Sequence, residues 1–346
     1  MDAEMQPQLV LSEWWRYAAW ARGQLASRLA ALDDAALSRP FAMGWGSLRA
    51  TLQHVYGADR VWAERIGMPG TAELPKSDTL ATPAAIGAAH VRLDEFRANW
   101  PAACDPVALA APVEYANSRG ERFQNTLGDI LLHVANHEIH HRAQISNMLR
   151  QFGAAPVTPG LDYIFFQLAQ PGGGTAAGEA PQLDLPTLRR LFAYSDWACD
   201  RVHAHARSLP DAALDQPFEI GVGSLRATLL HVRFAEHWWL QNWTEGPDRP
   251  FPELPVGTPI AELDGLWKET RARRNQLLAG MNTADLTQRL TARPRPGVER
   301  VFPIGVVLLQ LCGHGTHHRA QAQNMLRQVG AKPGDLDYIL WRRSVV

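Results

Sequence analysis

The stretch HEIHHRAQISNMLRQF (137–152) returns 177 residues later as HGTHHRAQAQNMLRQV (314–329), with eleven of sixteen positions identical. A second stretch, GWGSLRATLQHV (44–55), returns at the same offset as GVGSLRATLLHV (221–232), with ten of twelve positions identical. The sequence between these stretches diverges, but the offset is kept. The chain therefore contains an internal duplication, and we expect two copies of one fold.

The spacing of apolar residues predicts four helices in each repeat. Ser47 is expected to cap the second helix, and Gly153 is expected to end the fourth. Residues 105–125 are expected to form a hairpin or a long loop. Four amphipathic helices with short to moderate connections predict an all-α protein made of two tandem four-helix bundles. The helices are expected over residues 9–32, 47–67, 83–100 and 126–152, and over 185–208, 224–243, 260–282 and 303–329.

The division between the bundles is predicted from composition. The stretch AQPGGGTAAGEAPQL (169–183) is rich in Gly, Ala and Pro and lacks hydrophobic periodicity, which is typical of a linker. We therefore expect a first bundle over residues 1–168 and a second over 184–346. Both repeats close with the same tail, Leu-Asp-Tyr-Ile, at 161–164 and 336–339.

Composition excludes several classes of protein. The net charge of −1 over 346 residues gives no electrostatic case for a nucleic-acid partner or an anionic membrane. No apolar run approaches the roughly 20 residues of a membrane span, and the N-terminus lacks the basic start of a signal peptide. The three cysteines, Cys104, Cys199 and Cys312, are odd in number and unmatched between the repeats. We therefore expect a cytoplasmic protein without disulfides, acting on a small molecule.

Three histidines in each repeat have the pattern of metal ligands. His137 and His141 are four residues apart on one predicted helix, so both imidazoles can reach one ion, and His54 on the second helix can supply a third nitrogen. A lone pair at this spacing is more often packing or surface histidine, but the third histidine and the repetition favour a metal. Three ligands leave coordination positions open, as catalytic sites do. The predicted ligands of two divalent metal sites are His54, His137 and His141, then His231, His314 and His318.

Other repeated polar residues allow two interpretations. His140 and His317 point about 100° away from the predicted ligands, so we expect hydrogen bonding around the site rather than metal binding. Gln144 and Gln321 are expected either to steady a ligand or to bridge helices, as are Arg142 and Arg319. Asp59 and Glu236 each lie five residues past a predicted ligand, so they are not expected on the same face of the helix. The alternative is that they act as an acidic partner of a ligand or as a general base. General acid and base residues stay unassigned.

At these residues the chain resembles the DinB-like metalloprotein superfamily, as a tandem two-domain member. The resemblance rests on a histidine in the second helix and on the motif HxxHHRxQ, present as HEIHHRAQ (137–144) and HGTHHRAQ (314–321). It covers nearly the whole chain outside the linker. It implies four-helix bundles that hold a divalent metal through the six histidines named above, with zinc or nickel as the expected metal and iron as an alternative.

The resemblance also implies a class of reaction. Members of the superfamily include transferases that use low-molecular-weight thiols, a thiol-dependent maleylpyruvate isomerase and a domain of sulfoxide synthases. We therefore expect a metal-dependent enzyme of the thiol S-transferase type, with such a thiol as cosubstrate. The alternatives are a non-haem iron enzyme that uses oxygen and a non-catalytic metal-binding or stress-response protein. Members often form homodimers, so we expect a monomer with an internal pseudo-dimer or a homodimer.

The two sites are expected to differ in what they accept. The loops before the fourth helix of each repeat, around residues 116–123 and 291–302, share little sequence. If these loops border the sites, the two pockets have different shapes and select different ligands.

Overall fold

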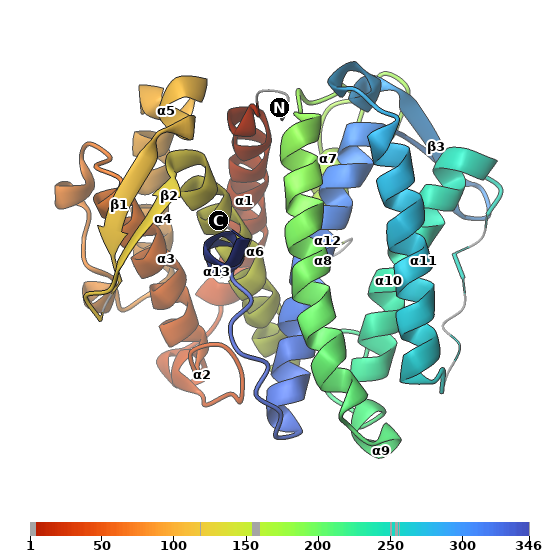
Figure 1. Cartoon of the computed structure of the whole chain (residues 1–346). Coiled ribbons are helices and arrows are strands. Elements are labelled where there is room, and N and C mark those ends of the chain that lie inside the picture. The colour runs from red at the N-terminus through yellow and green to blue at the C-terminus, as the bar shows by residue number, and fades with distance from the viewer. Residues whose placement is uncertain are drawn as a thin grey trace. The chain divides into compact units, whose positions relative to one another are not determined.

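The computed structural model describes residues 5–117, 119–153, 160–249, 251–252, 255 and 257–345. The chain divides into two compact units, one formed by Met1–Val157 with Asp335–Val346 and the other by Thr158–Gly334 (Figure 1). Each unit is built on a bundle of four long helices. The expected all-α fold of two tandem four-helix bundles is confirmed.

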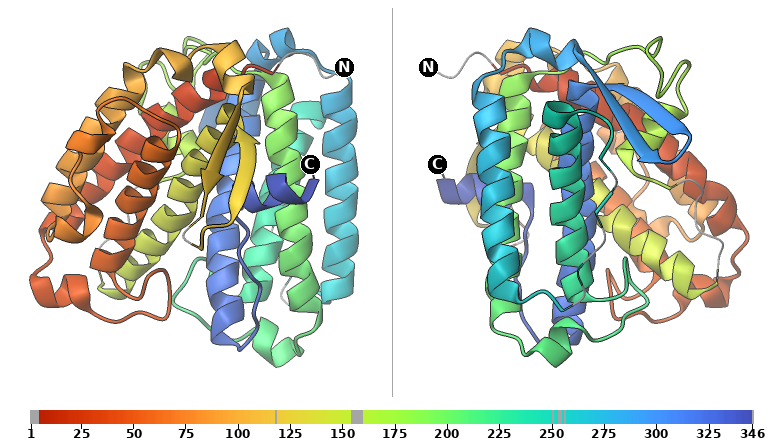
Figure 2. Two further views of the ribbon diagram at one scale, coloured as in Figure 1. Left: turned by 60° about the vertical axis from the view of Figure 1, so that its left-hand side comes forward. Right: turned by 90° about the vertical axis from the view of Figure 1, so that its right-hand side faces the viewer.

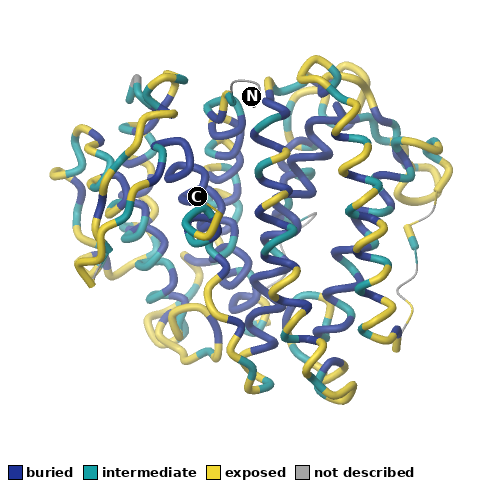
Figure 3. The backbone as a smooth tube through the Cα atoms, in the orientation of Figure 1, coloured by how far each residue is buried: buried dark blue, intermediate teal, exposed yellow. Residues whose placement is uncertain are grey.

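In the first unit the four long helices form a closed ring of contacts. Helix α1 (Pro7–Ala30) packs on α4 (Pro83–Ala98) and on α6 (Leu127–Gln151), and α3 (Leu48–Arg65) packs on the same two helices. Figure 3 shows α6 as an almost continuously buried helix. Short helices occupy the connections: α2 (Asp34–Ser38), η1 (Thr71–Glu73), η2 (Ser77–Thr79), η3 (Pro101–Ala103) and α5 (Pro106–Ala110).

The second unit repeats this arrangement. Helices α8 (Leu185–Arg207) and α10 (Leu225–Glu245) each pack on α11 (Ile260–Ala279) and on α12 (Ile304–Gln328). Helices α10, α11 and α12 begin 177 residues after α3, α4 and α6, so the offset read from the sequence is also the offset of the structure. The shorter helices described here are α7 (Tyr163–Leu168), α9 (Asp211–Leu214) and η4 (Thr283–Thr287).

Local signals set the ends of the helices. The Ser47 hydroxyl accepts a hydrogen bond from the Ala50 backbone N–H at 3.1 Å, which satisfies one of the free donors at the start of α3. Gly153 follows α6 with a φ of +72°, a left-handed conformation that favours glycine. Both predictions from the sequence are confirmed.

A two-stranded antiparallel hairpin precedes the last bundle helix of each unit. Strands β1 (Pro112–Ala116) and β2 (Arg122–Thr126) pair in the first unit, and β3 (Arg289–Arg295) and β4 (Val298–Pro303) pair in the second. The hairpin expected within residues 105–125 is therefore confirmed as β1 and β2, whereas Pro106–Ala110 form the short helix α5. Figure 2 shows the β3–β4 hairpin at one end of the second bundle, where it continues directly into α12.

The tail of each repeat packs in the unit formed by the other repeat. Helix α13 (Tyr338–Val345), from the end of the second repeat, packs on α6, and α7 (Tyr163–Leu168), from the first, packs on α12. Ile339 lies in an apolar cluster with Trp62 and Ile130, and the Tyr338 hydroxyl donates to the buried Asp129 carboxylate at 2.8 Å. The expected bundle boundaries at residues 168 and 184 follow the sequence repeat. In the structure, each compact unit instead contains the C-terminal tail of the other repeat.

The Gly-rich stretch 169–183 forms turns without a helix or strand. It is nevertheless anchored within the second unit, because the Val301 backbone N–H donates to the Gly174 carbonyl at 2.9 Å. Among the helices that the structure describes, none is long and apolar enough to cross a membrane.

Candidate metal centres

The three histidines of the first repeat converge through their Nε2 atoms. His54 comes from α3, and His137 and His141 come from successive turns of α6. The Nε2 atom of His137 lies 3.1 Å from Nε2 of His54 and 3.1 Å from Nε2 of His141. Nitrogens that bind zinc tetrahedrally at about 2.05 Å lie about 3.3 Å apart, so the separations suit one ion.

The second repeat has the same geometry. Nε2 of His231, on α10, lies 3.1 Å from Nε2 of His314 on α12. The His318 ring completes the group, with its centroid 4.6 Å from that of His231 and 4.4 Å from that of His314. Within the described part of the chain, these two triads are the groups of potential ligands whose donor atoms all lie within 4.8 Å of one another. The residues present therefore fit a divalent ion in each unit.

Burial favours the neutral form of five of the six triad imidazoles, and metal binding requires that form. Burial, and next the neighbouring His141, lower the pKa of His54 to about 3. Burial also places the pKa of His137, His314 and His318 well below the ordinary value of 6.5. These side chains are therefore uncharged at neutral pH.

A glutamine beside each triad fixes the orientation of one ligand. The His141 Nδ1–H donates to Gln144 Oε1 at 2.7 Å, so its Nε2 lone pair is left for the ion. Gln144 Nε2 in turn donates to His140 Nε2 at 3.1 Å. His140 therefore takes the hydrogen-bonding role expected for it, and Gln144 steadies a ligand rather than bridging helices.

The second unit builds the same chain of hydrogen bonds. His318 Nδ1 donates to Gln321 Oε1 at 2.7 Å, and Gln321 Nε2 donates to His317 Nε2 at 3.0 Å. The repeat therefore includes the residues that orient a ligand as well as the ligands.

The glycine-containing loop before α3 lies directly against this glutamine. Gly44 has a φ of +56°, and a Cβ at this position would lie 2.7 Å from Thr51 Oγ1 and 3.1 Å from Gln144 Oε1. A residue with a side chain would be strained at this positive φ, and its Cβ would clash with Thr51 and Gln144. Only glycine therefore lets the loop approach the site this closely. Gly221, at the matched position, approaches the Gln321 side chain in the same way.

The aromatic surroundings of the two triads differ. Trp45 stacks on the His54 ring at a centroid distance of 4.2 Å and is 58 % exposed. The matched residue in the second unit is Val222, and the His231 ring there contacts Phe251 at 6.1 Å between centroids. Among the described residues, a solvent-facing indole stacks on a triad histidine in the first unit and not in the second.

The acidic residues of α3 and α10 do not join the triads. Asp59 is buried with its carboxylate 3.5 Å from the Arg97 guanidinium, and Glu236 bonds Arg274 at 3.0 Å. Both carboxylates belong to ion pairs with arginines inside the bundles. The geometry therefore does not support a role for them as acidic partners of the triads.

The sequence reasoning missed Asp162. Its carboxylate, just before α7, acts against burial by raising the pKa of both His231 and His318, which places a negative charge near the second triad. The signal available was the repeated tail, in which Asp162 and Asp337 occupy matched positions. Nothing in the sequence indicated that the tail lies near a histidine triad.

Comparison with known proteins gives a consistent result. A model described as the DinB family matches the chain twice, over residues 5–175 and 183–344. The chain is also similar to Protein DinB of Bacillus subtilis (strain 168), with 29 % identity over 160 residues that cover 44 % of this chain and 91 % of that protein. No solved structure matches the chain significantly.

Proposed function

Because this chain belongs to the DinB family, we propose that each triad binds a divalent metal and that the protein is a metal-dependent enzyme of the thiol S-transferase type. The observation that carries the proposal is the convergence of three histidine ring nitrogens in each unit, without a carboxylate or thiolate completing the set among the described residues. Such a site leaves room for a substrate atom, as catalytic metal sites do.

We propose zinc or nickel as the bound ion. Imidazole suits both ions, and three neutral ligands leave the full positive charge of the ion uncompensated. When bound, the ion supplies this charge to lower the pKa of a thiol that reaches the site. Asp162 adds a negative charge that favours a cation in the second unit.

The chain's own residues would then hold and orient the reactants. The hydrogen bonds of Gln144 and Gln321 keep one imidazole of each triad in position. The exposed face of Trp45 offers an apolar surface for an acceptor next to the first triad. In the reaction with an aryl halide, a bond forms between the thiol sulfur and the ring carbon, the carbon–halogen bond breaks, and the halide ion and the thiol proton are released to solvent.

Conjugation assays test this function directly. The metal-free protein is loaded with zinc or nickel and incubated with glutathione or another low-molecular-weight thiol and an electrophilic aryl halide. We expect conjugation that depends on the added metal and falls at least tenfold in the double variant His141→Ala with His318→Ala. The control is His205→Ala, a half-buried histidine of α8 outside both triads. If the metal-loaded protein conjugates neither glutathione nor any other low-molecular-weight thiol tested, this reaction type is ruled out.

A further inference from the structure

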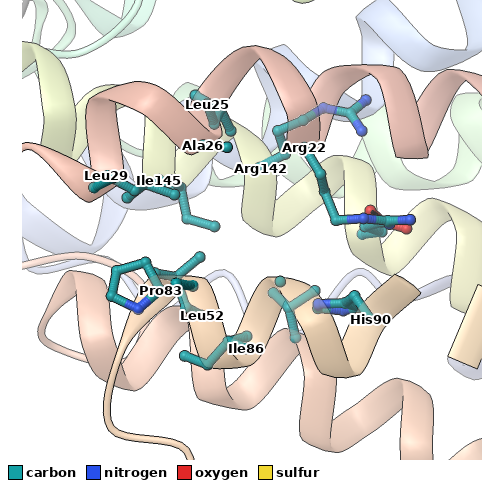
Figure 4. Close-up of a pocket in the computed structure, with 15 residues that line it drawn as sticks. Arg22, Leu25, Ala26, Leu29, Leu52, Pro83, Ile86, His90, Arg142 and Ile145 are labelled. Carbon is teal, nitrogen blue, oxygen red and sulfur yellow. Dashed lines mark hydrogen bonds and ion pairs between the residues drawn. The ribbon is translucent and has the colours of Figure 1, made fainter. Parts of the chain in front are cut away.

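The first unit contains a cavity of about 280 Å³ between α1, α3, α4 and α6. Apolar side chains line most of it, and Figure 4 shows Leu29, Pro83 and Ile145 at one end. Arg22 and His90 lie at the other end in the same view (Figure 4). The cavity is thus apolar along most of its length.

Small residues form the outer side of this cavity. Ala26 and Ala30 on α1 and Ala84 and Gly87 on α4 all line it, and all four are exposed to solvent. Val55 on α3 lines the inner side and is buried. The cavity therefore opens to solvent between α1 and α4 and has a buried apolar interior, so a small molecule can enter it.

The same place in the second unit is filled. The matched residues there enclose a space of only about 10 Å³. Trp267, at the position of His90, is buried, and its ring lies 5.8 Å from that of His203, at the position of Ala26. Two aromatic rings therefore occupy the space that is open in the first unit.

A hydrogen-bonded network also closes the outer side in the second unit. His203 Nδ1 donates to Asp264 Oδ1 at 2.6 Å, and Arg207 donates to Asp264 Oδ2 at 2.7 Å. The first unit has small residues at the three matched positions, which are Ala26, Gly87 and Ala30. Since both units share one fold and only one is open here, the bundle does not require the cavity.

The charged groups at the polar end of the cavity already have partners. The Arg22 guanidinium forms ion pairs with the carboxylates of Asp94 and Glu138. The His90 Nε2 atom is buried, so a ligand in the cavity does not reach it. This end therefore offers no free charge for a charged ligand.

The charge of Arg142 is also out of reach. The centre of its guanidinium lies 4.3 Å from the Tyr17 ring centroid, and its three nitrogens are buried without a hydrogen-bond partner in the described part of the chain. The matched Arg319 donates to Ser195 Oγ at 2.7 Å and to Thr316 Oγ1 at 3.0 Å, hydroxyls that the first unit lacks. Arg142 therefore contributes its apolar stem to the cavity wall.

We propose that this cavity binds a small uncharged molecule with an apolar body of one or two rings. An apolar cavity of about 150 Å³ is large enough to hold benzene, so the volume of about 280 Å³ suits up to two rings. Water finds few polar partners on such walls, and an apolar molecule that replaces it gains packing contacts. A charged molecule would lose its hydration without gaining a free partner.

The cavity is separate from the proposed reaction. None of the residues that line it belongs to the first triad. Binding of an apolar molecule therefore requires no metal, and it can be measured whether or not the chain conjugates a thiol.

Titration calorimetry of the full chain with toluene and indole tests the proposal, with benzoate and indole-3-carboxylate as charged counterparts. The titrations are run on metal-loaded chain and repeated after chelation, which removes any carboxylate binding to a metal ion. We expect one toluene or indole bound per chain in both states, and at least tenfold weaker binding of each carboxylate to the chelated chain. Absence of saturable toluene and indole binding overturns the proposal, as does equal binding of each neutral compound and its carboxylate after chelation.

A substitution at the opening locates the bound molecule. A Cβ at Gly87 would meet nothing within 4 Å, so Gly87→Leu fits without moving the backbone and places a branched side chain at the opening. We expect toluene binding to weaken at least tenfold. The matched control is Gly23→Leu, at an exposed glycine of α1 that has the same free space and does not line the cavity, and its binding should equal that of the wild type. Equal toluene binding in the two variants contradicts the assignment to this cavity.

Exchanging the lining for that of the second unit tests the comparison between the units. The variant that combines Ala26→His, Ala30→Arg, Gly87→Asp and His90→Trp is expected to abolish toluene binding, with an unchanged far-ultraviolet circular dichroism spectrum showing that the helices are folded. Toluene binding of wild-type affinity in this variant overturns the proposal. Gly87→Leu keeps the proposal open to refutation if the fourfold variant does not fold.

Discussion

Gln144 decides how His141 presents its Nε2 atom, because its side-chain oxygen accepts the Nδ1–H of that ring. Removing a hydrogen-bond partner of this kind from a metal-binding histidine typically weakens metal affinity 10–100-fold. We expect that loss at the first site in Gln144→Ala, measured by competition with a chelator in a chain whose second triad carries His318→Ala. Gln53→Ala, on α3 and bonded to the Leu80 carbonyl, is the matched control. Equal zinc affinity in the two variants would contradict the role of Gln144.

His90 makes the first unit sensitive to acid. Burial, and next the Arg22 guanidinium, lower the pKa of His90 to about 3, against about 6.5 in an unfolded chain. The unfolded state therefore gains a proton below pH 6.5 that the folded state takes up only near pH 3, and stability falls as the pH drops through this window. The charged groups nearest to His90 are Arg22, Asp59, Arg97 and Glu138.

The expected loss of stability follows from how far the pH lies below 6.5, the pKa of His90 in the unfolded chain. At pH 4.5, two units below 6.5, the loss is about 3 kcal/mol. His90→Gln cannot take up the proton, so between pH 7 and pH 4.5 the wild-type chain should lose about 3 kcal/mol more of its free energy of unfolding than this variant. Denaturant unfolding of the metal-free proteins at both pH values measures the difference. Parallel losses in the two proteins would show that His90 is not held neutral.

At the scale of single residues, the sequence identified the triads because helical spacing alone places His137 and His141 on one face. It could not assign Gln144, because the choice between steadying a ligand and bridging helices depends on a side-chain conformation. The sequence also did not indicate that the Arg142 guanidinium lacks hydrogen-bond partners. This becomes clear only when the acceptors of Arg319 are compared with the residues at the matched positions, Ala18 and Ile139.

Helix α13 is the element that most changes the description of the fold. Its Ile339 is 4 % exposed in the cluster around Trp62, so Ile339→Ala should destabilise the first unit by about 2–4 kcal/mol. Hydrogen exchange resolves the two units: exchange should become faster in α6 and stay unchanged in α12. Val345→Ala, at an exposed position of the same helix, is the control. Faster exchange in α12 instead would contradict the assignment of α13 to the first unit.

At the scale of elements, periodicity and caps predicted the eight long helices to within a few residues. Residues 105–125 stayed ambiguous because short alternating segments fit both a strand and a loop. The partners of the tails could not be predicted at all. Each repeat carries the same Leu-Asp-Tyr-Ile tail and a similar last helix, so the sequence pattern is identical whether a tail packs on its own repeat or on the other.

For the whole molecule, duplication has preserved the triads and their orienting glutamines while the surroundings have diverged. Trp45 lies beside the first triad and Asp162 lies near the second, so the two sites have different surroundings. The cavity of the first unit is a further difference. We therefore expect the two bundles to be equivalent in metal binding and to differ in what else they bind.

Elemental analysis of the purified, metal-loaded chain measures directly how many of the two triads bind an ion. The geometry of the two triads predicts two divalent ions per chain, falling to one in His141→Ala and to one in His318→Ala, because each variant removes a ligand from one triad only. Two ions retained in either variant, or fewer than two in the metal-loaded wild-type chain, would contradict it.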